Sequence, residues 1–501
     1  MRHILILILA VTIPISASVN AGEPIQIGSR LELLVDDHLI DQMSGGAHLQ
    51  LHKPERRNVA LVTDQPWEGN ACPYRSFFQD GDRYRLYYGA YQYDVAEGNQ
   101  TFAHKPYTCY AESTDGIHWT KPELGLVEFN GSKRNNIVLA ADSIKEIPLD
   151  PGHIAVFKDS NPSCPADAKY KALIRATEVR ALYALKSSDG IHFELLTKKQ
   201  LITDGAFDSE NLAFWDSVRG EYRAYFRDFR DGIRNIKTAT SPDFVHWSEP
   251  EWLVFPEAPV EHLYTNQVTP YYRAPHLLIG FPMRYTDRGW VDSTDKLSHP
   301  ELRRLRSSVS PRYGSAVTDA LMMTSRDGLT FRRWGEAIIR PGPARTDSWV
   351  YGDNMIAWGI IKTKSERSQS PAELSVYATE GYWTGQAMNI RRYAFRIDGF
   401  VSVHAPLSGG ELITKPLVFE GDKLEINYST SAAGGIWVEL QDLDGRPIAG
   451  YRESDCHEVF GDQIKRIVSW KDGDRVSDWA GKPVRLRFVL KDADLFSFRF
   501  R

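Results

Sequence analysis

The chain has 501 residues, of which 42% are hydrophobic and 25% charged, and its formal net charge is −5. This length is too great for one core, so we expect two or three domains. The balanced charge offers no basic surface for nucleic acid, so we expect no such partner. The 13 Trp and 23 Tyr residues suit either a ligand-binding cleft or β-rich cores, and composition does not choose between them.

The N-terminus predicts export. A basic start, Met1-Arg2-His3, precedes an apolar run at 4–13 and the small residues of 16–21. This order is typical of a cleavable secretory signal at residues 1–21. The alternative, a membrane anchor, needs about 20 apolar residues, more than this run contains. We therefore expect a secreted or periplasmic protein with no membrane span after signal cleavage.

A short phrase recurs four times after residue 60. It reads Ser-x-Asp, mostly followed by Gly, and it occupies 113–119, 187–193, 241–247 and 325–331, closing on an aromatic residue each time. Asp-Gly supplies a turn with positive φ, and the aromatic residue starts the returning strand. Such recurring hairpins are typical of a stacked or radial β array. The Asp of each phrase is therefore expected to be structural.

Strand-like runs surround each phrase. Runs rich in aromatic and β-branched residues occupy 75–79, 83–89, 170–175, 211–215, 221–226 and 276–281. Each unit thus reads as four antiparallel strands, the anatomy of a propeller blade. A fifth, weaker unit runs from 353–358 through 373–377 to 379–383. We predict a five-bladed β-propeller at 61–400 and favour it over a six-bladed one.

The chain changes character after about residue 400. The phrase is absent there, and Gly- and Asp-rich turns, including 491–494, separate strand-like runs at 412–419, 423–429, 436–443, 464–470 and 483–490. This pattern predicts that an all-β chain ends in a β-sandwich at 401–501. Residues 22–60 are expected to add strands to the propeller edge or to the interface between the domains.

Four cysteines are scattered along the chain: Cys72, Cys109, Cys164 and Cys456. None forms Cys-x-x-Cys or a His spacing typical of a zinc site, so we expect no metal and no cofactor. Export permits disulfides. Cys72 and Cys109 therefore have two alternatives, pairing with each other or remaining buried thiols.

A five-bladed propeller followed by a β-sandwich on an exported chain resembles the invertase-like glycoside hydrolases of families 32 and 68 and their relatives in families 43, 62 and 130. The recurring phrase is similar to the Ser-x-Asp-x-x-x-Trp hairpins of those families. The family-32 motifs Asn-Asp-Pro-Asn, Arg-Asp-Pro and Glu-Cys-Pro are absent, and residues 158–162 are their nearest echo. The resemblance is therefore to a distant or unclassified branch and implies neither sucrose nor fructan as substrate.

This resemblance implies a glycoside hydrolase that uses a pair of carboxylates in the propeller channel on a carbohydrate substrate. Residues just before the predicted inner strands would converge on that channel. The catalytic candidates are Glu68, Asp208, Glu210 and Glu261. The substrate-binding candidates are Trp67, Arg75, Asn211, Tyr264, Asn266, Tyr351, Asp353 and Asn354.

By analogy with these families, Glu68 would be nucleophile or base, and Asp208 or Glu210 the proton donor. Glu261 is an alternative donor. Each acid also has a structural alternative: a loop position for Glu68, a turn cap for Asp208, and channel ion pairs for the other two.

Two further hypotheses keep the fold and change the function. A carbohydrate-binding propeller would need the aromatic and amide residues without the catalytic acids. A glycoside phosphorylase would need a basic pocket for phosphate. The sequence leaves the substrate, the linkage and the oligomeric state open.

Overall fold

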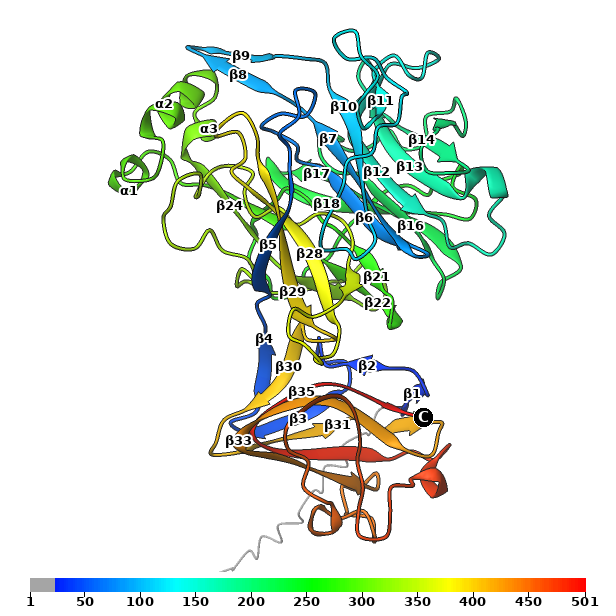
Figure 1. Ribbon diagram of the computed structural model, residues 1–501. Helices are drawn as coiled ribbons and strands as arrows, with labels where there is room; N and C mark the ends of the chain where they lie inside the picture. The colour runs from blue at the N-terminus through cyan, green and yellow to red at the C-terminus, as the bar shows by residue number, and fades with distance from the viewer. Residues whose placement is uncertain (1–22) are drawn as a thin grey trace, which may run out of the picture.

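The computed structural model of the protein describes residues 23–501 (Figure 1). The predicted signal sequence at 1–21 lies outside the described residues. Within 23–501, no helix is long and apolar enough to cross a membrane.

The described chain is built almost entirely from strands, which confirms the all-β prediction. Residues 23–501 contain five four-stranded antiparallel sheets, which fill the upper part of Figure 1 and are numbered I to V here. Sheet I consists of β6 (Arg75–Asp80), β7 (Arg83–Ala90), β10 (Tyr107–Ser113) and β11 (Ile137–Ala140). Sheet II consists of β12 (Leu149–Lys158), β13 (Tyr170–Ala176), β14 (Leu182–Ser187) and β15 (Glu194–Leu195).

The other three sheets follow the same strand order. Sheet III consists of β16 (Leu212–Asp216), β17 (Glu221–Arg230), β18 (Ile233–Ser241) and β19 (Glu251–Trp252). Sheet IV consists of β21 (Thr269–Tyr271), β22 (Ala274–Gly280), β25 (Met323–Ser325) and β26 (Arg332–Arg333), and beside it β20 (His262–Leu263), β23 (Met283–Asp287) and β24 (Ala316–Ala320) pair with one another. Sheet V consists of β27 (Ile361–Thr363), β28 (Glu373–Glu380), β29 (Asn389–Arg396) and β5 (Glu55–Val62).

The recurring phrase follows the third strand of sheets I to IV, and its Asp is structural. In the first copy, Asp115 Oδ1 accepts the backbone N–H groups of Ile117 and His118 at 2.7 and 2.8 Å. Ser113 Oγ accepts the N–H of Gly116, whose φ is +69°. The other three aspartates accept the same pair of backbone N–H groups.

These turns also join neighbouring sheets. Tyr87 of sheet I donates a hydrogen bond to the carbonyl of Gly190, in the turn of sheet II, at 2.7 Å. Tyr225 of sheet III bonds Gly328 of sheet IV in the same way, at 2.8 Å. Each contact pairs a tyrosine on a second strand with the turn glycine of the next sheet.

Between sheets II and III, both partners of this contact are different residues. Leu173 stands where β7 and β17 carry Tyr, and Phe244 stands where the other turns carry Gly. Phe244 adopts a φ of +68°, is fully buried and shares a core cluster with Leu173. Apolar packing therefore replaces the tyrosine–carbonyl hydrogen bond at this junction.

The fifth unit differs from its prediction. The predicted unit ends with 379–383, but β28 ends at Glu380, because Gly381 and Trp383 have positive φ values of 74° and 59°. The third strand is instead β29, and the N-terminal strand β5 supplies the fourth. The last sheet is thus completed by residues from the start of the described chain.

Sheets V and I are joined at their inner edges. The N–H of Trp358 donates to the carbonyl of Arg75 at 2.7 Å, and the N–H of Phe77 donates to the carbonyl of Trp358 at 2.9 Å. These hydrogen bonds link the segment leading into β27 to β6. The last of the five sheets therefore adjoins the first.

Two insertions that the sequence analysis did not predict interrupt the sheets. A hairpin of β8 (Tyr93–Ala96) and β9 (Asn99–Phe102) follows β7, and helices α1 (Asp292–Asp295), α2 (Pro300–Val309) and α3 (Arg312–Ser315) lie between β23 and β24. They touch where the N–H of Gly98 donates to Ser308 Oγ at 2.7 Å. Both lie at the same end of the five sheets in Figure 1.

The second body, in the lower part of Figure 1, is a strongly bent eight-stranded sheet with its own hydrophobic core. Its strands are β2 (Glu32–Leu33), β3 (Ile40–Gly45), β4 (His48–Leu51), β30 (Val401–Ala405), β31 (Gly410–Thr414), β33 (Leu424–Gln441), β34 (Asp462–Ile467) and β35 (Arg485–Phe500). Beside it, β1 (Ile25–Gly28) pairs with β32 (Leu417–Phe419).

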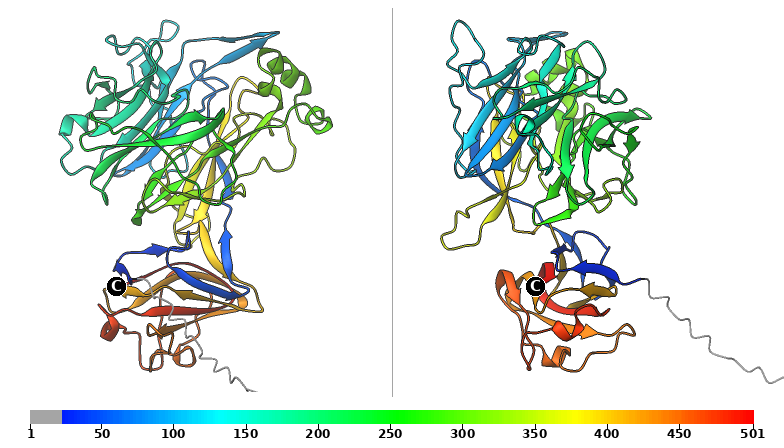
Figure 2. Two further views of the ribbon diagram at one scale, coloured as in Figure 1. Left: turned by 180° about the vertical axis from the view of Figure 1, so that it is seen from behind. Right: turned by 90° about the vertical axis from the view of Figure 1, so that its right-hand side faces the viewer.

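Residues 22–60 were predicted to add strands to the propeller edge or to the interface between the domains. β5 is the fourth strand of sheet V, whereas β2, β3 and β4 pair within the C-terminal sheet and β1 pairs with β32, in the body that is separate in Figure 2. One prediction for this region was wrong. The predicted turn at 491–494 lies inside β35, because β33 pairs with β35 on both sides of a bulge.

The two bodies share one apolar cluster. It includes Leu33 of β2, Ile279 of sheet IV, Leu374 of sheet V and Phe400. Beside it, the buried carboxylate of Glu32 accepts a hydrogen bond from Arg326 of sheet IV's turn at 3.0 Å. Cys72 and Cys109 are free buried thiols, as are Cys456 and the partly buried Cys164, so no disulfide joins them.

The sheet-to-sheet turn contact predicts a specific loss of stability. A methyl group added at Gly190 would lie 2.7 Å from the hydroxyl of Tyr87, whereas one at Gly220 would meet nothing within 4 Å. Both glycines have positive φ, 79° and 70°, so Gly220→Ala is a matched control for backbone strain. Gly190→Ala should lower the free energy of unfolding by at least about 1 kcal/mol more than Gly220→Ala. Thermal or denaturant unfolding measures this, and equal losses would contradict the contact.

Candidate active site

One small pocket collects residues from all five upper sheets. It has a volume of about 190 Å³ and lies where the segments leading into the first strands meet. Both insertions also contribute to its wall. Its lining residues are Pro73, Tyr74, Tyr91, Tyr93, Gln100, His153, Asp208, Tyr264, Arg312, Tyr313, Tyr351, Tyr382 and Trp383.

Three predicted residues are in this pocket: Asp208, Tyr264 and Tyr351. Asp208 precedes β16, and its side chain is 58% exposed although it forms an ion pair with the buried Arg227. It also lines a neighbouring cavity of about 440 Å³ together with Phe207. The two cavities adjoin at Asp208, and together they fall in the range of small-ligand sites, roughly 300–1,000 Å³.

Tyr264 is surrounded by polar and charged side chains. Tyr74 donates a hydrogen bond to its hydroxyl at 3.3 Å, and the guanidinium groups of Arg227 and Arg234 lie 5.2 and 5.6 Å from its ring centre. Burial acts to raise the pKa of Tyr264. The charge of Arg227 and hydrogen bonds from Tyr351 and Tyr74 outweigh burial and lower that pKa below its ordinary value.

His153 of β12 is held by a carboxylate behind it. Its Nδ1 lies 2.9 Å from Asp150 Oδ2 and 2.9 Å from the hydroxyl of Tyr91. Burial lowers the pKa of His153, although Asp150 acts to raise it, so the neutral imidazole is favoured. A carboxylate that accepts from Nδ1 leaves Nε2 as the basic nitrogen. The pair thus presents an oriented base to the pocket.

Glu210 is buried on the inner side of sheet III and does not line the pocket. Gln267 donates to its Oε2 at 2.7 Å, and its Oε1 has no partner among the described residues. Burial raises the pKa of Glu210 from 4.5 to about 8, although Gln267 and Arg75 act to lower it. This carboxyl group is therefore protonated at neutral pH.

Glu68 and Trp67 do not lie in the pocket. The Glu68 carboxylate is fully buried and accepts hydrogen bonds from Lys121 Nζ at 2.7 Å and from the hydroxyl of Tyr88. Burial has the largest effect and raises the pKa of Glu68, although Lys121 acts to lower that pKa. Trp67 donates its indole N–H to Asn136 at 2.7 Å. Both residues anchor the loop before β6 instead of facing a ligand.

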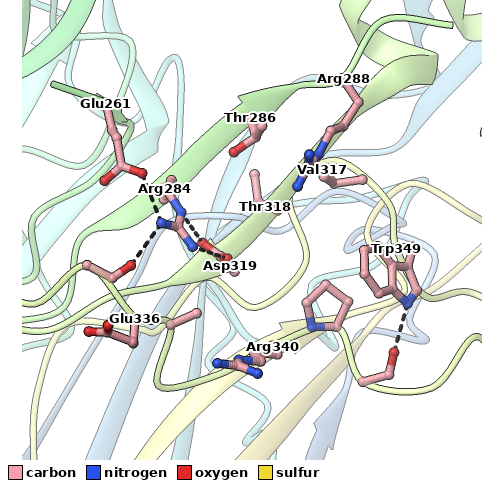
Figure 3. A pocket seen from close by; sticks show the side chains of 14 residues that line it. Glu261, Arg284, Thr286, Arg288, Val317, Thr318, Asp319, Glu336, Arg340 and Trp349 are labelled. Carbon is pink, nitrogen blue, oxygen red and sulfur yellow. Dashed lines mark hydrogen bonds and ion pairs between the residues drawn. The ribbon is translucent and has the colours of Figure 1, made fainter. Parts of the chain in front are cut away.

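Glu261 lies in a different cavity, at the edge of sheet IV (Figure 3). Its Oε1 accepts from Arg284 at 2.9 Å and its Oε2 from Arg333 at 2.6 Å. Arg284 is also bidentate to Asp319, at 2.9 and 2.7 Å. These contacts neutralise both acids and leave Glu261 without a free oxygen for catalysis.

The remaining predicted binding residues support the backbone around the pocket. Arg75 donates to the carbonyls of Cys72 and Met355 at 2.8 and 2.9 Å. The side chains of the others also bond to the main chain nearby, and none lines the pocket: Asn211, Asn266, Asp353 and Asn354.

The sequence analysis missed most of the pocket wall. Tyr91, Tyr93 and Gln100 belong to the β8–β9 region, and Arg312 and Tyr313 begin α3. A signal for the helical insertion exists, since Pro300 at the first turn of an amphipathic, arginine-rich run is typical of a helix start. Nothing in the sequence indicated that these insertions reach the pocket.

Groups of three or more His, Cys, Asp or Glu residues able to hold a metal ion do not occur in residues 23–501.

No model of a protein family matches this chain, and no curated protein matches it. Similar solved structures include an N-acetylgalactosamine deacetylase from F. plautii (12% identity, TM-score 0.42, 70% of this chain and 95% of that chain). Others are the catalytic domain of a family-62 α-L-arabinofuranosidase from Coprinopsis cinerea (8%, 0.41, 69% and 99%) and a β-1,2-mannobiose phosphorylase from Listeria innocua (14%, 0.41, 68% and 96%). One of these structures belongs to family 62, which is among the families that the sequence resembles. The names of the three proteins give three different reactions.

The surroundings of Tyr264 predict an early-ionising phenol. Its hydroxyl should deprotonate at lower pH than those of Tyr74, Tyr91 and Tyr351, because Arg227 stabilises the phenolate. Arg227→Gln should move this ionisation to higher pH. The ultraviolet absorbance of tyrosinate, compared between the native protein and Tyr264→Phe, isolates the signal. An unchanged titration in Arg227→Gln would contradict the assigned cause.

The buried Glu210 predicts a pH-dependent stability. Its folded pKa is raised to about 8 from 4.5, so the folded state binds the proton that the unfolded state releases. Its stabilising contribution is complete below pH 4.5 and is lost as pH rises to about 8. Glu210→Gln, which is neutral throughout, should therefore gain in melting temperature relative to the native protein across this interval. A constant difference in melting temperature would exclude a raised pKa.

Proposed function

We propose that this protein is an exported enzyme that cleaves a glycosidic bond of an oligo- or polysaccharide in the pocket at the centre of sheets I to V. In this proposal the five sheets form a five-bladed propeller and the second body a β-sandwich. The predicted signal sequence would direct the chain to the periplasm or the exterior.

The observation that carries the proposal is the composition of the pocket wall. Seven tyrosines and Trp383 surround a single exposed carboxylate, Asp208, and the oriented base His153. Aromatic faces bind the C–H faces of sugar rings, and their hydroxyl edges bind sugar hydroxyl groups. Cleavage additionally needs one group that donates a proton and one that accepts a proton.

We assign three residues to the reaction. His153 Nε2, with Nδ1 held by Asp150, accepts the proton of the attacking water. Tyr264, whose pKa is lowered, protonates the leaving glycosidic oxygen more readily than an ordinary phenol would. Asp208 faces the developing positive charge of the sugar ring, which an ionised carboxylate stabilises. This set replaces the carboxylate pair expected from the family resemblance.

The test is product release from a panel of oligosaccharides by the mature protein and its variants. Asp208→Asn and His153→Gln should each lower kcat by roughly 10²–10⁴-fold. Glu261→Gln, an acid outside the pocket, should retain the native rate. Thermal unfolding of each variant controls for loss of the fold.

Two results would overturn this function. Release of a sugar that is unaffected by both pocket variants would place the chemistry elsewhere. Binding of a glycan by all variants alike, with no product from any substrate, would identify a carbohydrate-binding protein.

A further inference from the structure

One arginine lines the pocket and two more lie behind its wall. Arg312 of α3 lines the pocket directly, with its guanidinium 4.8 Å from the ring centre of Tyr313. Arg227 and Arg234 lie on the face of Tyr264. The carboxylate that lines the pocket, that of Asp208, is paired with Arg227.

Two of these arginines lack a carboxylate partner. Among residues 23–501, no Asp or Glu oxygen lies within 4 Å of the guanidinium of Arg234 or Arg312. Buried nitrogens of both remain without a hydrogen-bond partner, Nε of Arg234 and Nη1 of Arg312. Burial lowers the pKa of Arg234, and the like charges of Arg312 and Arg227 lower it further. The like charges of Arg312 and Arg227 therefore act unfavourably on Arg234.

Other arginines of the same body are better paired, although several of them, Arg75 included, also keep a nitrogen without a partner among the described residues. Arg75 donates to the carbonyls of Cys72 and Met355, and Arg284 is bidentate to Asp319 in the cavity of Figure 3. An unpaired, half-buried guanidinium is unfavourable unless a ligand supplies the missing anion. The guanidinium of Arg312 lies where the proposed function places the sugar.

We propose that the sugar ring bound in this pocket carries an anionic group, a carboxylate or a sulfate ester, and that Arg312 and Arg234 recognise it. Guanidinium groups bind both anions through paired N–H···O hydrogen bonds. Arg227 remains with Asp208 and completes the positive field. This assignment rests on the proposed function, because it takes the pocket to be the sugar site.

Calorimetric binding to three matched probes tests it: oligogalacturonides, sulfated galacto-oligosaccharides and uncharged galacto-oligosaccharides of equal length. One anionic probe should bind at least about tenfold more tightly than the uncharged one, since hydrogen bonds between two charged groups are stronger than those to a neutral group. Arg312→Gln should remove this preference, and Arg312→Lys should restore part of it. Arg340→Gln, an exposed arginine of the cavity in Figure 3, is the matched control and should change nothing.

The outcomes separate this inference from the proposed function. The anionic probe that binds identifies the group as carboxylate or sulfate. Cleavage of uncharged probes alone, at a rate insensitive to Arg312→Gln, would overturn the anionic substrate and leave the enzyme proposal standing. Cleavage of uncharged probes that requires inorganic phosphate and Arg312 would overturn it too, since the anion would then be the co-substrate. Tight, Arg312-dependent binding of an anionic probe that is never cleaved would support the inference and refute the enzyme.

Discussion

The pocket depends on the hydrogen bonds that join the first and last of the five sheets. The carbonyl of Arg75 accepts from Trp358, while its guanidinium reaches the carbonyl of Met355 and the hydroxyl of Thr379 across the same seam. A buried guanidinium is tolerated only when such acceptors surround it. With this seam closed, all five segments that lead into the first strands are brought to one place. The N-terminal strand β5 secures the closure from outside, as the fourth strand of sheet V.

At the turns between neighbouring sheets, the contact is a tyrosine–carbonyl hydrogen bond in some places and apolar packing in another. A tyrosine hydroxyl on a glycine carbonyl and a leucine beside a phenylalanine fill the same junction. The exchange requires Phe244 to adopt a backbone conformation that glycine adopts without strain. The two positions therefore differ together at this junction, where both residues belong to one apolar cluster. This is the pattern expected of a packing constraint.

Strand positions and the role of the repeated aspartates could be predicted from the sequence, because both depend on local chemistry. Period-two alternation locates β7 and β13 to within one residue and the start of β17, which runs four residues beyond its predicted end. The same reasoning failed where distant partners decide the structure. The turn at 491–494 looks polar and local, yet pairing with β33 extends the strand through it. Trp67 and Glu68 precede an inner strand as expected, but contacts with Asn136 and Lys121, far along the chain, turn them away from the pocket.

The same principle decides which acids remain available for chemistry. Glu261 and Asp208 both stand just before a strand, and the sequence gives no reason to prefer either. In the structure, Arg284 and Arg333 hold both oxygens of Glu261, whereas Arg227 alone holds Asp208 and leaves most of its side chain exposed. The chain as a whole carries a net charge of −5, yet its pocket holds arginines without carboxylate partners. What the pocket can bind therefore depends on which arginines and carboxylates form ion pairs around it, and not on the net charge of the chain. These ion pairs join residues that the arrangement of the five sheets brings together.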